Sequence, residues 1–131
     1  MRAFLQSLVR SSAWDSGRRL KYLLDREPDP SACAVSGIPP ESTERALRLF
    51  CDAFDIPEEQ MFCLRPPDVI QDIYRAMVPG VCDDMEYERL MIGLEEVIGR
   101  ELAEGECMRI ATIEDLIRFV HERALPLKEN I

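Results

Sequence analysis

The sequence predicts an all-α fold: a small helical bundle with a helical extension at its N-terminus. Apolar residues recur at intervals of three and four in several segments, as expected for helices with one buried face. Prolines and glycines separate these segments, and no alternating strand pattern or internal repeat is present. A chain of 131 residues that is 47% hydrophobic fits one small domain with a modest core.

Residues 1–41 form a basic N-terminal extension followed by a proline-rich linker. The extension holds a helical stripe made of Phe4, Leu5, Leu8 and Val9, and a second short pattern made of Leu20, Leu23 and Leu24. We expect this helix to pack on the core, with a membrane or partner surface as the alternative. The linker, "REPDPSACAVSGIPPES", contains four prolines and predicts irregular structure.

Residues 42–123 form the predicted helical domain. Ser42 is expected to cap its first helix, because its hydroxyl can accept from free backbone N–H groups. Asp55-Ile56-Pro57 ends that helix, "EEQMFCL" is expected to be a loop, and Pro66 or Pro67 can open a short helix. The two apolar faces are Ala46, Leu47, Phe50, Ala53 and Phe54, then Val69, Ile70, Ile73, Tyr74 and Met77.

The second half of this domain predicts two more helices. The first carries the stripe Tyr87, Leu90, Met91, Leu94 and Ile98, and Gly99 ends it. Leu102 and Ile110 bracket a polar loop, and Thr112 with Asp115 can cap the last helix. The last stripe is Ile113, Leu116, Ile117 and Val120. Residues 124–131, with Pro126, are expected to be a loose tail.

The charge is strongly acidic and unevenly distributed. The formal net charge is −9, which disfavours nucleic acid as a partner because the phosphate backbone would repel the chain. Residues 1–21 carry five basic residues and one acidic residue, a net +4, and the other 110 residues carry −13. The basic arm can fold back on the acidic body or touch an acidic partner.

The five cysteines favour a reducing, cytoplasmic setting. Their number is odd, no CxxC pair occurs, and several lie in apolar patterns where a free thiol behaves as a small hydrophobe. The N-terminal apolar run is too broken for a signal peptide, and no run reaches the roughly 18 residues of a membrane span.

No motif for catalysis or metal binding stands out, so we expect no enzyme, no cofactor and no metal site. His121 is the only histidine and the cysteines lack zinc spacing. There is no G-x-S-x-G elbow, no glycine-rich phosphate loop and no EF-hand pattern. The many carboxylates fit a solvated helix surface without any acid–base role.

From Asp83 onward, "DDMEYERLMIGLEEVIGRELAEGECMRIATIEDLIRFV" resembles an acyl carrier protein. That family has a D-S-L-D start, an amphipathic helix with a leucine-glutamate-glutamate run, a polar loop, a turn and a final helix. Here Asp83, Met85 and Glu86 match the start, Leu94-Glu95-Glu96 the run and Ile110-Ala111-Thr112 the turn. Upstream, the helix from Ser42 followed by "DIPEEQ" is similar to the family's first helix and its exit, and "PPDVIQDI" is similar to the segment that leads towards the family's serine.

The resemblance extends over residues 42–123 and departs from the family at two places. "YRAMVPGVC" is inserted before the motif, and Asp84 stands where the family has its phosphopantetheine-bearing serine. A carboxylate cannot form the stable phosphodiester that this attachment requires. The resemblance therefore implies a carrier-like module without the prosthetic group.

The main role expected for Asp84 is to cap the following helix, as Asp83 can one residue earlier. A sharper hypothesis is that Asp84 supplies a permanent anion where a carrier holds its phosphate.

The resulting hypothesis is a non-catalytic interaction module that docks through an acidic helix onto a protein with a basic surface. Its docking residues would be Asp83, Asp84, Glu86, Glu88, Glu95 and Glu96. Two alternatives are a small acidic chaperone or adaptor, and a working carrier read in another register. The last would need another serine, and none follows Ser42. The sequence does not indicate an oligomeric state.

Overall fold

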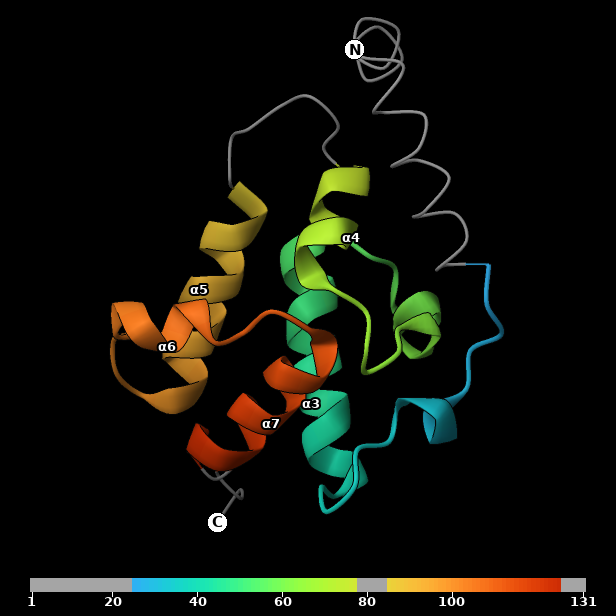
Figure 1. The fold of residues 1–131 in the computed structure, drawn as a ribbon, viewed down its shortest axis with the longest axis horizontal. Helices are drawn as coiled ribbons and strands as arrows, with labels where there is room; N and C mark the ends of the chain where they lie inside the picture. The colour runs from blue at the N-terminus through green and yellow to red at the C-terminus, as the bar shows by residue number, and fades with distance from the viewer. Residues whose placement is uncertain (1–24, 78–84, 126–131) are drawn as a thin grey trace, which may run out of the picture.

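The computed structural model describes residues 25–77 and 85–125, and within these ranges the protein is all-α with no strand (Figure 1). Its long helices are α3 (Pro40–Phe54), α5 (Met85–Ile98) and α7 (Ile113–Arg123), and its short ones are α4 (Ile70–Met77) and α6 (Glu104–Met108). Two 3₁₀ helices, η1 (Pro30–Cys33) and η2 (Glu58–Cys63), complete them. The all-α prediction is confirmed, whereas the predicted N-terminal helix and the tail from Pro126 lie outside the described residues.

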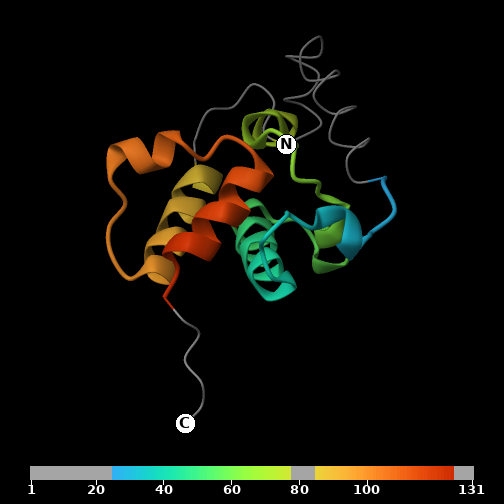
Figure 2. The same ribbon diagram turned by 60° about the horizontal axis from the view of Figure 1, so that its bottom comes forward.

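The helix α3 is the centre of the bundle, because both α5 and α7 pack against it. Figure 1 shows α4 near one end of α3 and α6 beside α5. Turning the molecule shows α5 and α7 running side by side (Figure 2). The three predicted apolar stripes of the long helices meet in this centre, where all four residues of the α7 stripe are buried.

The helix α3 begins three residues earlier than the sequence suggested. Its N-cap is Pro39 and its first residue is Pro40, which is well suited to that position because it lacks an N–H group. The predicted capping role of Ser42 is therefore wrong, and its hydroxyl lies 3.1 Å from Nδ1 of His121. The predicted end is confirmed, since Asp55 adopts a left-handed φ of 58° and its N–H bonds to the Cys51 carbonyl.

An aromatic cluster joins α3 to α4 and α5. The rings of Phe50 and Phe54 stack with centroids 4.4 Å apart, and Phe54 meets Tyr87 edge-on at 5.8 Å. Tyr74 of α4 lies 4.8 Å from Tyr87 and 6.2 Å from Phe54. Such pairs contribute about 0.5–1.5 kcal/mol each beyond their buried area. This cluster therefore fixes how α5 faces α3.

The segment before α4 pairs with the start of α7. The N–H of Ile70 donates to the Ala111 carbonyl and that of Ile113 donates to the Asp68 carbonyl, both at 2.9 Å. These bonds delay the start of α4 to Ile70, so the expected helix start at Pro66 or Pro67 is wrong. Val69 was predicted on the apolar face of this helix, which is wrong, because it lies in this pairing before α4 and is exposed. The prediction of a loop at "EEQMFCL" is also wrong, because this segment contains the 3₁₀ helix η2.

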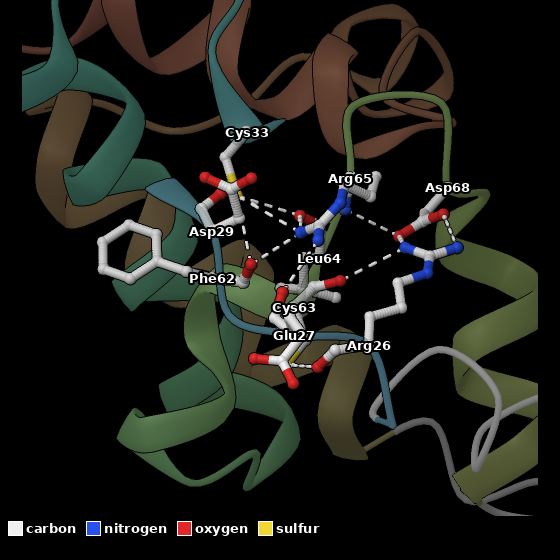
Figure 3. A network of polar contacts seen from close by, with 9 residues as sticks. All are labelled: Arg26, Glu27, Asp29, Cys33, Phe62, Cys63, Leu64, Arg65 and Asp68. Atoms are coloured by element: carbon white, nitrogen blue, oxygen red, sulfur yellow. Dashed lines mark hydrogen bonds and ion pairs between the residues drawn. The ribbon is translucent and has the colours of Figure 1, made fainter. Parts of the chain in front are cut away.

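The first described residues are held against η2 by the polar network in Figure 3. Arg26 donates two hydrogen bonds to the Asp68 carboxylate, at 2.9 and 3.1 Å. Arg65 donates to the carbonyls of Phe62, Leu64 and Glu27. Because the Asp68 side chain is only 6% exposed, this bidentate pair is shielded from solvent and anchors the chain at Arg26.

Part of the predicted linker contributes to the core. Cys33 and Val35 are buried among the core residues, and the Cys33 thiol donates to the Leu64 carbonyl at 3.0 Å. The bundle therefore includes residues upstream of α3.

The connection between α5 and α7 is built around one carboxylate. Glu106 accepts two hydrogen bonds from Arg100, one from Arg123 and one from the Ala103 N–H. These bonds hold the short helix α6 in place. The prediction of a polar loop in this segment is therefore wrong. The start of α7 is as predicted, since Thr112 and Asp115 form a capping box.

Glu106 should make stability depend on pH. Its pKa is lowered to about 2, from an ordinary value of 4.5, chiefly by its hydrogen bonds from Arg100. A depressed folded-state pKa gives stability above pH 4.5 that is lost as the pH falls towards 2. The free energy of unfolding, measured by urea titration, should therefore separate the native chain from Glu106→Gln above pH 5 and converge at low pH.

The matched control is Glu122→Gln, which removes one exposed carboxylate from α7. It should leave stability almost unchanged. A Glu106→Gln difference that is constant from pH 2 to 6 would contradict this account.

A side chain at Gly99 should destabilise the fold. Gly99 ends α5 as predicted, with a φ of +78°, and a Cβ there would lie 2.6 Å from Cδ1 of Leu125. Gly99→Ala should destabilise by about 1–2 kcal/mol, since the left-handed conformation disfavours Cβ. Gly105→Ala is the control, because a Cβ there meets nothing within 4 Å and the residue is helical. Chemical denaturation giving equal shifts for both variants would refute this reading.

Candidate protein-docking face

The side of α5 away from the core is a continuous exposed stripe. Its members recur at positions i, i+3, i+4, i+7 and i+11, which lie on one face of a helix. We call this surface the α5 outer face; it consists of Met85, Glu88, Arg89, Ile92 and Glu96. Leu90, Leu94 and Ile98 occupy the opposite side and are buried.

Two large apolar side chains lie on this face. Met85 is 55% exposed and Ile92 is 56% exposed. Exposed apolar side chains are common singly, but these two lie two turns apart on one helix face, where a partner could cover both. Neither residue was among the docking residues predicted from the sequence. The available signal was that Ile92 falls outside the predicted apolar stripe.

The six predicted docking acids do not share one face. Glu88 and Glu96 are exposed on the α5 outer face, and neither is ion-paired to a described residue. Asp83 and Asp84 lie outside the described residues, so the structure does not place them.

The other two acids make contacts within the fold. Glu95 is half-buried, and its carboxylate accepts from the Leu102 N–H at 2.9 Å, which holds the loop after α5. The Glu86 side chain is only 18% exposed, and one of its oxygens is buried without a hydrogen-bond partner among the described residues. Both side chains are therefore largely withdrawn from solvent and are not part of the α5 outer face.

Arg89, the one cation of the α5 outer face, is directed towards α3. Its guanidinium lies 3.1 Å from Asp55, the residue that caps α3, and 3.9 Å from Glu86. Within the described residues, Arg89 forms ion pairs with Asp55 and Glu86 and with neither Glu88 nor Glu96. The outer face keeps an apolar centre with an acidic margin.

The neighbouring surface of α3 has a different charge character. Leu49 packs against Gly93, where a Cβ would lie 3.3 Å from its Cδ1, so α3 and α5 approach closely. An open hollow lies along α3, lined by Glu41, Glu44, Arg45, Arg48, Leu49 and Asp52. There Arg48 binds Glu44 at 2.7 Å and Glu58 at 2.9 Å. Arg48 therefore pairs with two acids on this side, whereas no described cation pairs with Glu88 or Glu96.

The described thiols are poor nucleophiles. Burial raises the pKa of Cys51 to about 12 and also raises the pKa values of Cys33, Cys63 and Cys107. A thiol with a raised pKa is protonated at neutral pH and reacts slowly. Cys82 lies outside the described residues.

The described part of the chain offers no other reactive arrangement. His121 is exposed and hydrogen-bonded to Ser42. No group of three histidine, cysteine, aspartate or glutamate side chains within residues 25–77 and 85–125 is placed to hold a metal ion. None of the helices in those ranges has the length and apolar character needed to cross a membrane.

Neither a protein-family model, nor a curated protein, nor a solved structure matches this chain. The α5 outer face therefore has to be interpreted from its own residues.

Proposed function

We propose that this protein is a non-catalytic, acyl-carrier-like interaction module that docks through the α5 outer face onto a basic surface of a partner protein. It would carry no phosphopantetheine group. The exposed apolar centre would be buried in the complex, and the acidic margin would select and orient the partner.

The observation that carries the proposal is the exposure of Ile92 between two carboxylates that form no ion pair with a described residue. Glu88 lies one turn before Ile92 and Glu96 one turn after it, and all three side chains are exposed. Burying Ile92 from its present 56% exposure would favour association, while the acids would favour a cationic partner.

The order of helices gives further support. The resemblance implies a first helix, an amphipathic helix that follows the attachment position, a polar loop and a final helix. Here α3, α5 and α7 follow that order, with α4 between α3 and α5 and with α6 in place of the loop, and the described part of α5 begins at Met85. With no serine after Ser42, a hydroxyl for attachment at that position is lacking.

A promiscuous phosphopantetheinyl transferase is a suitable probe partner, because such an enzyme has to recognise carrier-like surfaces. Glu88→Lys combined with Glu96→Lys should weaken its affinity about tenfold, since like charges would meet at the interface. The control, Glu59→Lys with Glu122→Lys, makes the same change in net charge at exposed acids outside α5. Binding is measured by titration calorimetry, and equal losses in both pairs would reject α5 as the docking helix.

Intact mass after incubation with coenzyme A and the same transferase tests the missing attachment. The native chain should gain no mass, because Asp84 cannot form the phosphodiester. Asp84→Ser should gain one phosphopantetheine if the docking surface and register are carrier-like. An adduct on the native chain would contradict the non-carrier role, and the absence of one on Asp84→Ser would remove the support for the carrier-like register.

A further inference from the structure

The charge around α5 is not balanced by the described residues themselves. Residues 25–77 and 85–125 contain ten arginines, no lysine and 21 acidic residues. The arginines nearest the ends of α5 are already bound, Arg89 to Asp55 and Arg100 to Glu106. Glu88 and Glu96 are thus left as a negative margin around the exposed Ile92.

The first 21 residues of the chain complement this surface in two ways. They carry a net charge of +4, from Arg2, Arg10, Arg18, Arg19 and Lys21 against Asp15. Their apolar stripe of Phe4, Leu5, Leu8 and Val9 has the spacing of a helix that lays one face on a groove or a neighbouring helix. We call residues 1–21 the basic arm.

We propose that the basic arm docks on the α5 outer face of its own chain, with its apolar stripe against Ile92 and its arginines beside Glu88 and Glu96. The arm thereby competes with the basic partner for the same surface. This consequence rests on the proposed function, whereas the docking of the arm does not require any partner.

The network in Figure 3 supplies the anchor for this arrangement. Arg26 is held by Asp68, and its carbonyl accepts from the Cys63 thiol at 3.0 Å. The chain is therefore held to the body at Arg26. Sixteen residues separate Arg10 from Arg26, a reach of up to about 50 Å when extended and about 24 Å when helical.

The reach of the arm is sufficient for contact within one molecule. A body of 94 described residues has a radius of gyration of about 12 Å, so its whole surface lies within range of the extended arm. A tethered segment has an effective concentration near the millimolar range, which exceeds ordinary protein concentrations. Docking within one chain is therefore favoured over exchange between two copies.

Zero-length cross-linking tests the contact directly. The chain has only two lysines, Lys21 and Lys128, so the conservative change Arg10→Lys adds one assignable amine to the arm without altering its charge. A carbodiimide condenses this amine with a touching carboxylate, and peptide mass spectrometry identifies the pair. The expected product is a link from position 10 to Glu88 or Glu96.

Variant controls test which carboxylates are linked, and an isotope control tests whether the link lies within one chain. In the Arg10→Lys background, Glu88→Gln with Glu96→Gln should abolish the link, and Glu59→Gln with Glu122→Gln should preserve it. A mixture of ordinary and ¹⁵N-labelled chains should give links only within one isotope. Links to other carboxylates alone would overturn the proposal, and links of mixed isotope would assign the contact to exchange between copies and also overturn it.

The competition is measured separately, with the same transferase as partner. Neutralising the arm through Arg10→Gln, Arg18→Gln and Arg19→Gln should raise the affinity for the partner about three- to tenfold, because the surface is then free more of the time. Unchanged affinity would contradict competition. A link without any partner binding would contradict the proposed function alone, and partner binding at α5 without the link would contradict the arm alone.

Discussion

The burial of the two phenylalanines of α3 is the constraint on which the rest of the structure depends. Phe50 and Phe54 are fully buried and stack on each other, and the tyrosines of α4 and α5 meet Phe54 edge-on. Edge-on aromatic contacts are directional, so they fix rotation as well as distance. The helix α5 consequently has one possible inward side, formed by Leu90, Leu94 and Ile98.

The character of the outward side of α5 follows from this rotation. With Leu94 inside, Ile92 has to face outward between Glu88 and Glu96. The same rotation directs Arg89 to Asp55 at the end of α3, and brings Glu95 to the Leu102 N–H in the loop before α6. The functional hypothesis therefore derives from core packing: the core determines which acids remain available to a partner and which stabilise the connections.

Periodicity was sufficient to predict the three long helices because their buried faces are continuous and repeat at helical spacing. Periodicity failed where hydrogen bonds between segments distant in the sequence determine where a helix begins or whether it forms. Pairing of Asp68 and Ile70 with the start of α7 delays α4, and the arginines bound to Glu106 convert an expected loop into α6. In the sequence, the six docking acids were selected only because they lie outside or just before the apolar stripe of α5. That criterion cannot distinguish Glu88, which is exposed, from Glu86, which lies close to Arg89 and is mostly buried.

The most direct test of the account is a methyl NMR titration with a phosphopantetheinyl transferase. The isoleucine δ1 methyl groups of the native chain are ¹³C-labelled and followed as the enzyme is added. Docking through α5 predicts that the Ile92 signal shifts or broadens most, while those of Ile70 and Ile73, buried in α4, change least. An unchanged Ile92 signal beside a perturbed one elsewhere, with binding shown by calorimetry, would contradict the central claim.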